Sequence, residues 1–422
     1  MRSVYNTLWF IAEPIMRMIS GALVGMYAAR YLGPSGYGSL SLVITICALA
    51  MTVGRMGIDS VMVRELTNAG THEEKLKILS SGFWLTNIVG GILYAGGAVI
   101  ALFVSDKSQL LGLLVYGLAL FTQGSLVIDY YAQHRSAVKT VVQIKVACLA
   151  LSSAVTVAAV MLSADPLYFY VIPLAEKVLL ATALGVHQKY FRLPSRYPFA
   201  AWSDMQALAG AAKMMWVTTI FQSLYSRIDH LVIAALLSTE SLGLYAVAVR
   251  FYEAFSSLPY LIASSLLPNM LRWKSSSDKE YYSKLRTLMS AFFWGCLVIS
   301  VLSSGAFFVL LPKFMGDKYL ASVWPLSIMC CAVPFLAVGT MGIRHQIVVG
   351  LDSKIAKRSI SSSLMSLCIG VPLIHYFGIN GAAVSLLITT ISINVAFDFF
   401  DSELLGLGKI KLSVMAPFFF SK

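Results

Sequence analysis

Charged residues are scarce in this 422-residue sequence, where lysine, arginine, aspartate and glutamate together make up only 12%. Soluble domains carry about 25% of such residues, so the chain has too few charges to cover a surface that faces water. Hydrophobic residues reach 58%, and the mean hydropathy is +0.76. This composition excludes an ordinary soluble protein and indicates a polytopic membrane protein whose main solvent is lipid.

Motifs for covalent or metal chemistry are also missing. The six cysteines all fall in apolar stretches, and the six histidines do not have the spacing of metal ligands. No G-x-x-x-x-G-K-S/T loop for a nucleotide phosphate occurs. We therefore expect no metal site, no organic cofactor and no ATP-driven motor, and a chain that is not an enzyme.

Long neutral stretches separate the few charges. A helix needs about 20 apolar residues to cross the hydrocarbon core, whereas the strict alternation of a transmembrane β-barrel is absent. The sequence therefore predicts an all-α polytopic membrane protein with about twelve transmembrane helices in two six-helix lobes. These helices are expected near residues 7–30, 37–63, 80–104, 109–133, 141–162, 167–189, 211–236, 241–268, 286–311, 322–349, 357–376 and 379–400.

Lysine and arginine are distributed unequally between the predicted loops. If the N-terminus is cytoplasmic, 22 basic residues, Lys145 and Lys411 among them, fall on that side and four on the other. This bias predicts cytoplasmic N- and C-termini. Basic loops that face anionic lipid also explain the net charge of +12 without any role for nucleic acid.

The longest polar connection, Phe191 to Gly210, divides six predicted helices from six. A weak internal repeat supports two similar halves, because Gly38 and the three residues after it align with Gly243 and the three after it, an offset of 205 residues. Many secondary transporters consist of two parallel halves with the substrate between them. We predict an N-terminal lobe at 1–190, a cytoplasmic linker at 191–210, a C-terminal lobe at 211–400 and a cytoplasmic tail at 401–422.

Ionisable residues inside the predicted spans are candidates for function, because a charge in hydrocarbon is costly unless it faces a cavity or a partner. Arginine suits phosphate because its planar fork donates paired hydrogen bonds, so a basic lean favours a bulky or anionic cargo over a plain cation. The candidates for a cationic substrate-binding cavity are Arg17, Arg55, Lys177, Arg227 and Arg250. The candidates for coupling to an ion gradient are Glu13, Asp59, Asp229 and Glu253.

Spacing predicts which of these charges pair locally. Residues three or four apart share a helix face, which applies to Glu13 with Arg17, Arg55 with Asp59, and Arg250 with Glu253. Residues one or two apart point in different directions, so partners on other helices, or water, are expected for Arg227, Asp229, Glu176 and Lys177. Near the predicted cytoplasmic ends, side chains can reach the lipid headgroups, which is the role expected of Asp129 and Asp398.

Two passages carry a resemblance to a known family. Residues 28–66, AARYLGPSGYGSLSLVITICALAMTVGRMGIDSVMVREL, look like the start of the Wzx-type polysaccharide flippases of the multidrug/oligosaccharidyl-lipid/polysaccharide (MOP) exporter superfamily. Residues 226–262, SRIDHLVIAALLSTESLGLYAVAVRFYEAFSSLPYLI, resemble the start of that family's second half. The resemblance implies a MATE-like fold of twelve helices in two lobes that work by alternating access.

The resemblance also implies a cargo. Members of that family carry undecaprenyl-pyrophosphate-linked O-antigen or capsule repeat units across the bacterial inner membrane, from the cytoplasmic to the periplasmic leaflet. Their central cavity is cationic, and Arg17, Arg55 and Arg250 fall in the corresponding helices. The implied partners are the lipid-linked oligosaccharide and the bilayer, with a polysaccharide polymerase and a chain-length regulator as candidate protein partners. Because the chain has no ATP-binding loop, we expect the driving force to be an H⁺ or Na⁺ gradient, consumption of the product outside, or both.

Two other functions stay open at this point. A multidrug cation antiporter of the same superfamily would have a cavity dominated by acids, whereas the deep charges here are mixed with a basic lean. A polytopic O-antigen polymerase would need a sizeable external loop for its chemistry, whereas the outward loops expected here span only about 5–12 residues. A scaffold without transport is disfavoured by the buried charges.

Overall fold

The structure is a computed structural model that describes residues 2–103, 106–135, 137–191, 193–194 and 196–415. Every regular element within these residues is a helix, and no strand occurs among them. The predicted all-α class is therefore confirmed. Its physical cause is the lipid solvent, which offers no hydrogen-bond partner, so that each spanning segment must satisfy its own backbone groups.

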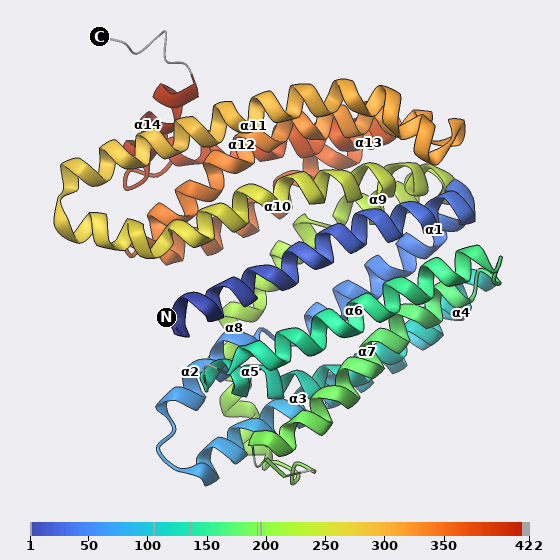
Figure 1. The fold of residues 1–422 in the computed structure, drawn as a ribbon, viewed down its shortest axis with the longest axis vertical. Helices are drawn as coiled ribbons and strands as arrows, with labels where there is room; N and C mark the ends of the chain where they lie inside the picture. The colour runs from blue at the N-terminus through green and yellow to red at the C-terminus, as the bar shows by residue number, and fades with distance from the viewer. Residues whose placement is uncertain (1, 104–105, 136, 192, 195, 416–422) are drawn as a thin grey trace. The chain divides into compact units, whose positions relative to one another are not determined.

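The chain divides into two compact units, and the first contains Met1–Leu32 and Ser39–Leu224. Figure 1 shows α3, α6 and α7 of this unit as extended rods. Its elements are α1 (Arg2–Gly54), α2 (Ile58–Asn68), α3 (His72–Ala101), α4 (Lys107–Gly117), the 3₁₀ helix η1 (Leu118–Leu126), α5 (Val127–His134), α6 (Val138–Met161), α7 (Tyr168–His187), η2 (Gln188–Phe191) and nearly all of α8 (Trp202–Tyr225). The segment Gly33–Gly38 of α1 belongs to the second unit.

The second unit contains Gly33–Gly38 and Tyr225–Lys422. In this unit α10, α11, α12 and α13 pack side by side (Figure 1). Its elements are α9 (Ile228–Leu236), α10 (Thr239–Ser276), α11 (Asp278–Met315), η3 (Asp317–Ser322), α12 (Val323–Val348), α13 (Asp352–Asn394), η4 (Ala396–Phe399) and α14 (Leu405–Met415). The predicted lobe limits, 1–190 and 211–400, stay a prediction.

Eight helices of the described chain are both long enough and apolar enough to cross a bilayer. Two of them, Glu13–Gly54 and Lys357–Phe399, have 42 and 43 residues, which is about twice the length needed for one crossing. Each is interrupted by a glycine in a non-helical conformation, Gly33 (φ 68°) and Gly378 (φ 59°). Both interruptions fall where the sequence predicted a turn between spans. With α8–α9 and α10, the architecture is consistent with about twelve crossings.

Exposed apolar side chains agree with helices that cross a membrane. On α11, which is long and apolar, Val298, Val301, Leu302 and Val309 are all more than half exposed. A contiguous apolar surface of this kind would be unstable against water, but it matches the hydrocarbon of a bilayer. The chain is therefore a multi-pass membrane protein.

Three predicted spans are not continuous helices, and these predictions were wrong in that respect. The span predicted at 37–63 breaks at 55–57, where Gly57 adopts a left-handed conformation (φ 63°). The span at 109–133 contains the 3₁₀ helix η1, and the span at 211–236 breaks between α8 and α9. Each break lies inside a stretch that is long enough for one continuous span, so span length alone does not reveal it. Packing accounts for the first, because a Cβ at Gly57 would overlap the backbone of Trp216.

The predicted linker and tail are also more ordered than a polar connection would be. In the linker 191–210, Leu193, Tyr197 and Ala200 are buried, and Trp84 Nε1 of α3 donates to the Pro198 carbonyl at 3.0 Å; residues 192 and 195 lie outside the described residues. In the predicted tail 401–422, α14 packs against α11 and η4. The tail residues 416–422 lie outside the described residues.

The two positions of the internal repeat meet within the second unit. The Gly33–Gly38 segment of α1 packs against the first turn of α10 so closely that a Cβ at Gly38 would overlap the carbonyl of Thr239. A Cβ at Gly243 would overlap the carbonyl of Pro34 in the same way. Glycine is therefore required at both equivalent positions, because any side chain would force the two backbones apart.

Candidate functional site

A cavity of about 890 Å³ lies within the first unit. Its size is in the range of binding sites for small organic molecules, about 300–1,000 Å³. Five of the nine candidate residues from the sequence line it, together with two further charged residues that sequence reasoning placed elsewhere. The charged lining residues are Glu13, Arg17, Arg55, Asp59, Asp129, Lys145 and Lys177.

Helix α1 contributes the central pair of this cavity. Arg17 Nη2 lies 3.2 Å from Glu13 Oε1, as their spacing on one helix face predicted. The other prong of the same guanidinium, Nη1, lies 3.7 Å from Glu176 Oε1 of α7. Both prongs of Arg17 therefore already have a carboxylate partner.

Helix α6 adds a cation on the other side of Glu13. Lys145 Nζ lies 3.3 Å from Glu13 Oε2 and 2.7 Å from Asp129 Oδ2 of α5. Its side chain is only 16% exposed, so the predicted placement of Lys145 among the cytoplasmic loop residues was wrong. Asp129 is likewise buried beside Lys145 and does not extend toward headgroups. The predicted helix at 141–162 includes Lys145, and this position inside a span was the sequence signal that Lys145 could line the cavity.

Helix α7 completes the arrangement with two adjacent residues. Lys177 Nζ lies 3.3 Å from Glu176 Oε1, although neighbouring residues on a helix were expected to point apart. A flexible lysine side chain can bend back along the helix to its neighbour, which the backbone angle alone does not capture. Together these contacts form a row of alternating charges: Asp129, Lys145, Glu13, Arg17, Glu176 and Lys177.

Arg55 and Asp59 line the same cavity at the break between α1 and α2. Arg55 follows the last residue of α1, and Asp59 belongs to the first turn of α2. The predicted pairing assumed four residues of continuous helix between them. The turn at Met56 and Gly57, both with positive φ, removes that helical spacing.

The electrostatic balance of the lining is closer to neutral than the sequence suggested. Four basic and three acidic side chains line the cavity, and Glu176 lies directly behind Arg17 and Lys177. The expected excess of fixed positive charge is therefore small while every group is ionised. A ligand of either sign must compete with the internal partners of these side chains.

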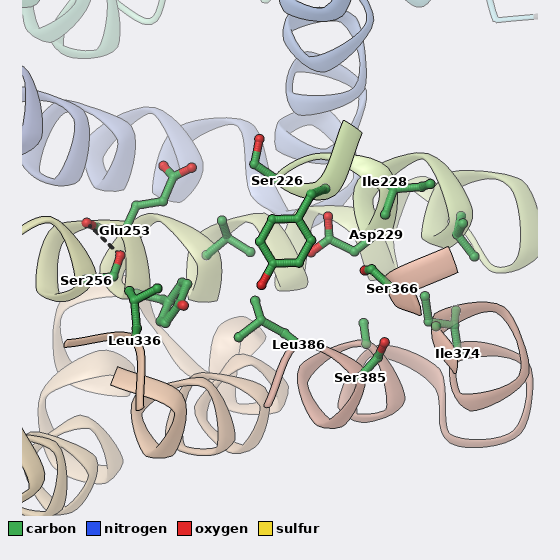
Figure 2. A pocket seen from close by; sticks show the side chains of 16 residues that line it. Ser226, Ile228, Asp229, Glu253, Ser256, Leu336, Ser366, Ile374, Ser385 and Leu386 are labelled. Atoms are coloured by element: carbon green, nitrogen blue, oxygen red, sulfur yellow. Dashed lines mark hydrogen bonds between the residues drawn. The ribbon is translucent and has the colours of Figure 1, made fainter. Parts of the chain in front are cut away.

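The other four candidates lie in the second unit, where a separate cavity of about 240 Å³ is lined by Asp229, Glu253 and several serines. In Figure 2 the Glu253 carboxylate lies at the left of the view, apart from Asp229 and Ser366. Glu253 lies 3.2 Å from Arg227 Nη2 and 3.8 Å from Arg250 Nη1, so both arginines gather around this acid. The pairing of Arg250 with Glu253, and a partner on another helix for Arg227, agree with the sequence predictions.

Asp229 has partners of its own in this second cavity. It accepts a hydrogen bond from the Tyr245 hydroxyl of α10 and lies 3.0 Å from Nδ1 of the neighbouring His230. The nine candidates thus fall into two groups, one in each unit. Among the described residues, no group of three histidine, cysteine, aspartate or glutamate side chains could hold a metal ion.

A third charged cluster lies outside both cavities, at the end of the second unit where α14 packs. Asp398 is fully buried, 2.5 Å from Lys411 Nζ and 3.6 Å from Arg358 Nη1. Lys411 is fully buried as well and also donates to the Asn394 carbonyl at 2.8 Å. The prediction that Asp398 reaches the headgroups was wrong, because Asp398 is fully buried beside Lys411 of α14. The assignment of residues 401–422 to a cytoplasmic tail stays a prediction.

Comparison with known proteins gives a family and a fold. Residues 28–324 match the family described as polysaccharide biosynthesis protein, and this range contains both passages that carried the resemblance. The comparison with curated proteins yields no match.

Solved structures match over nearly the whole chain. The structure titled lipid II flippase MurJ, inward closed conformation, matches with a TM-score of 0.78 at 14% identity, over 99% of this chain and 92% of that one. An inward-facing multidrug resistance MATE family transporter of the MOP superfamily matches with a TM-score of 0.62 at 13% identity, over 98% and 100% of the two chains. Its outward-facing counterpart gives 0.60 at 12% identity, over 98% and 96%. The chain therefore shares the fold of these three structures.

Proposed function

Because the chain belongs to the polysaccharide biosynthesis protein family, shown by the match over residues 28–324, we propose that it is a flippase for lipid-linked oligosaccharides. The cargo is an undecaprenyl-pyrophosphate-linked O-antigen or capsule repeat unit, carried from the cytoplasmic to the periplasmic leaflet of a bacterial inner membrane by alternating access. The fold shared with a lipid II flippase supports a lipid-linked cargo.

The observation that carries this proposal is the charged cavity of the first unit. A polyprenyl tail can stay in the bilayer while the diphosphate and sugars cross through a sheltered polar path. The cavity is large enough for a diphosphate and adjoining sugar. Arg17, Arg55, Lys145 and Lys177 line it and can offset the loss of hydration of the diphosphate.

We assign energy coupling to the acidic residues of the two cavities. In the first unit, Glu13 and Asp59 lie beside cations in the cavity, so binding or release of a proton there changes the charge offered to the cargo. In the second unit, Asp229 and Glu253 line a smaller pocket together with several serines, and we assign binding of H⁺ or Na⁺ as the coupling ion to these two acids. The proposed orientation has both termini in the cytoplasm, and a polymerase and a chain-length regulator act on the exported units.

A multidrug cation antiporter is the second candidate, and the near balance of acids and bases in the large cavity favours it more than the sequence did. The two functions differ in which charges are essential. A cation antiporter depends on the acids and tolerates loss of Arg17, whereas a flippase for a diphosphate depends on the bases.

The test replaces Arg17 or Arg250 with alanine in a cell that needs the chain for its surface polysaccharide. We expect loss of surface polymer in each variant, with normal amounts of protein in the membrane. Arg64→Ala is the matched control, because Arg64 is 61% exposed, pairs with Glu65 and does not line the cavity. Normal polymer in both Arg17→Ala and Arg250→Ala would remove the proposed role of these side chains.

A further inference from the structure

Glu176 was not among the candidate residues, yet it holds two of the cavity cations at once. Its Oε1 lies 3.7 Å from Arg17 Nη1 and 3.3 Å from Lys177 Nζ. Its other oxygen, Oε2, accepts a hydrogen bond of 2.9 Å from the Ser152 hydroxyl of α6. The side chain is only 13% exposed, so these contacts are poorly screened by water.

This geometry limits how Arg17 can bind an anion. A guanidinium recognises phosphate best when two of its N–H groups point at two oxygens of the ligand. In Arg17 both terminal nitrogens already face carboxylates, Glu13 on one side and Glu176 on the other. A diphosphate must therefore take the place of at least one carboxylate before Arg17 can hold it with both prongs.

The two carboxylates differ in how readily they can be displaced. The Arg17–Glu13 contact is the shorter, at 3.2 Å, and joins two residues of one helix. The Arg17–Glu176 contact is longer, at 3.7 Å, and joins α1 to α7. If Arg17 turns away, Glu176 keeps both Lys177 and Ser152 as partners. Displacement of Glu176 therefore leaves no unpaired buried charge, which would otherwise be strongly unfavourable.

We propose that Glu176 is an internal counter-ion that pairs with Arg17 and Lys177 before the cargo binds, and that the diphosphate of the cargo displaces it from Arg17 while Lys177 and Ser152 keep it paired. This inference rests on the proposed function and gives Glu176 a positioning role in it. The returning carboxylate competes with the bound diphosphate, so Glu176 weakens binding and promotes release. Without it, the cavity would hold its cargo more tightly and turn over more slowly.

The first experiment measures binding of inorganic pyrophosphate to the purified full-length chain by calorimetry. Glu176→Gln keeps the shape and removes the charge, and we expect pyrophosphate to bind about fivefold more tightly, which corresponds to about 1 kcal/mol for a partly exposed ion pair. Glu176→Ala should change affinity in the same direction. Glu65→Gln is the control, because Glu65 lies outside the cavity and pairs with Arg64.

Glu176→Asp separates charge from shape. If the charge is what matters, aspartate should restore an affinity close to that of the wild type while glutamine does not. If Glu176 only fills space and accepts a hydrogen bond, glutamine is the closer substitute and aspartate the poorer one. The order of the two variants thus distinguishes a counter-ion from a structural residue.

A transport measurement gives the second readout. In proteoliposomes with a lipid-linked diphosphate oligosaccharide, Glu176→Gln should lower both KM and kcat, since tighter binding slows release. A structural defect would lower kcat without lowering KM. Unchanged KM in Glu176→Gln would overturn the counter-ion role.

The outcomes also separate this inference from the proposed function. If Arg17→Ala weakens pyrophosphate binding while Glu176→Gln leaves it unchanged or weaker, the counter-ion role is wrong and the diphosphate cavity stands. If the wild type and Arg17→Ala bind pyrophosphate equally poorly, the proposed cargo is wrong and the inference falls with it. Tighter binding in Glu176→Gln and Glu176→Ala, with Glu176→Asp close to the wild type, supports both.

Discussion

The buried cluster of Arg358, Asp398 and Lys411 predicts an unequal response to loss of its members. Asp398 and Lys411 are fully buried, and Arg358 is 4% exposed, so the cluster holds two cations and one carboxylate away from water. Asp398→Asn would leave both cations without a counter-ion. Removal of one partner from a buried ion pair costs about 3–5 kcal/mol, and here the loss leaves two like charges together.

Lys411→Met should be milder for two reasons. It leaves Asp398 paired with Arg358, 3.6 Å away, and it removes the excess cation. What is lost is the hydrogen bond of Lys411 to the Asn394 carbonyl and its contact with Asp398, together about 1–3 kcal/mol. The double variant Asp398→Asn/Lys411→Met should be more stable than Asp398→Asn alone, because it removes one of the two cations that Asp398→Asn leaves without a counter-ion.

Thermal unfolding of the purified chain in detergent, followed by tryptophan fluorescence, checks this order. Trp294 of α11 donates to the Val414 carbonyl of α14 at 3.2 Å, so its emission reports on the release of that helix. At about 2–4 °C for each kcal/mol, Asp398→Asn should lower the apparent melting temperature by about 6–20 °C. Asp278→Asn is the control and should lower it by less, because Asp278 is 69% exposed at the start of α11, where it pairs with Lys274 of α10.

Two results would refute the reasoning. One is a melting temperature for Asp398→Asn no lower than that of Asp278→Asn, which would mean that the cluster is hydrated. The other is a larger loss in Lys411→Met than in Asp398→Asn, which would mean that packing of the lysine stem against Gly342 outweighs the charge balance.

Two further predictions concern close packing and pH. Gly38→Ala should lower the apparent melting temperature by an amount equivalent to about 1–3 kcal/mol, because its Cβ would overlap the Thr239 carbonyl. Gly305→Ala is the control and should not lower the melting temperature, because no atom lies within 4 Å of the new Cβ. Equal effects of the two substitutions would contradict the close approach at Gly38. The ammonium of Lys354 donates to Asp401 at 2.6 Å and holds the pKa of Asp401 below its ordinary value of 3.8. The stability that this pair contributes is therefore fully present above that value and is lost as the pH falls through the lower, folded-state pKa. Stability curves of the wild type and Asp401→Asn should accordingly differ at neutral pH and converge below pH 3.8, and a constant difference down to the lowest pH would exclude this assignment.

Composition alone settled the class of the protein, because a chain with 12% charged residues cannot be solvated by water over its whole surface. Hydrophobic length settled the approximate helices, and glycine with neighbouring polar residues marked the turns at Gly33 and Gly378. Local spacing also gave the ion pairs that lie on one helix, Glu13 with Arg17 and Arg250 with Glu253. All of these depend on interactions over a few residues or on bulk solvation, which a sequence records directly.

Tertiary structure decided which charges share a space. Lys145 joins Glu13 to Asp129, and Glu176 joins Arg17 to Lys177, because α1, α5, α6 and α7 meet around one cavity. No periodicity within a single helix encodes such a meeting. Lys411 gives a second case, since a residue of the predicted tail 401–422 is fully buried where α14 packs against its unit. The physical reason is that the cost of a charge in a membrane protein depends on its partners in space, and these are fixed only when the helices pack.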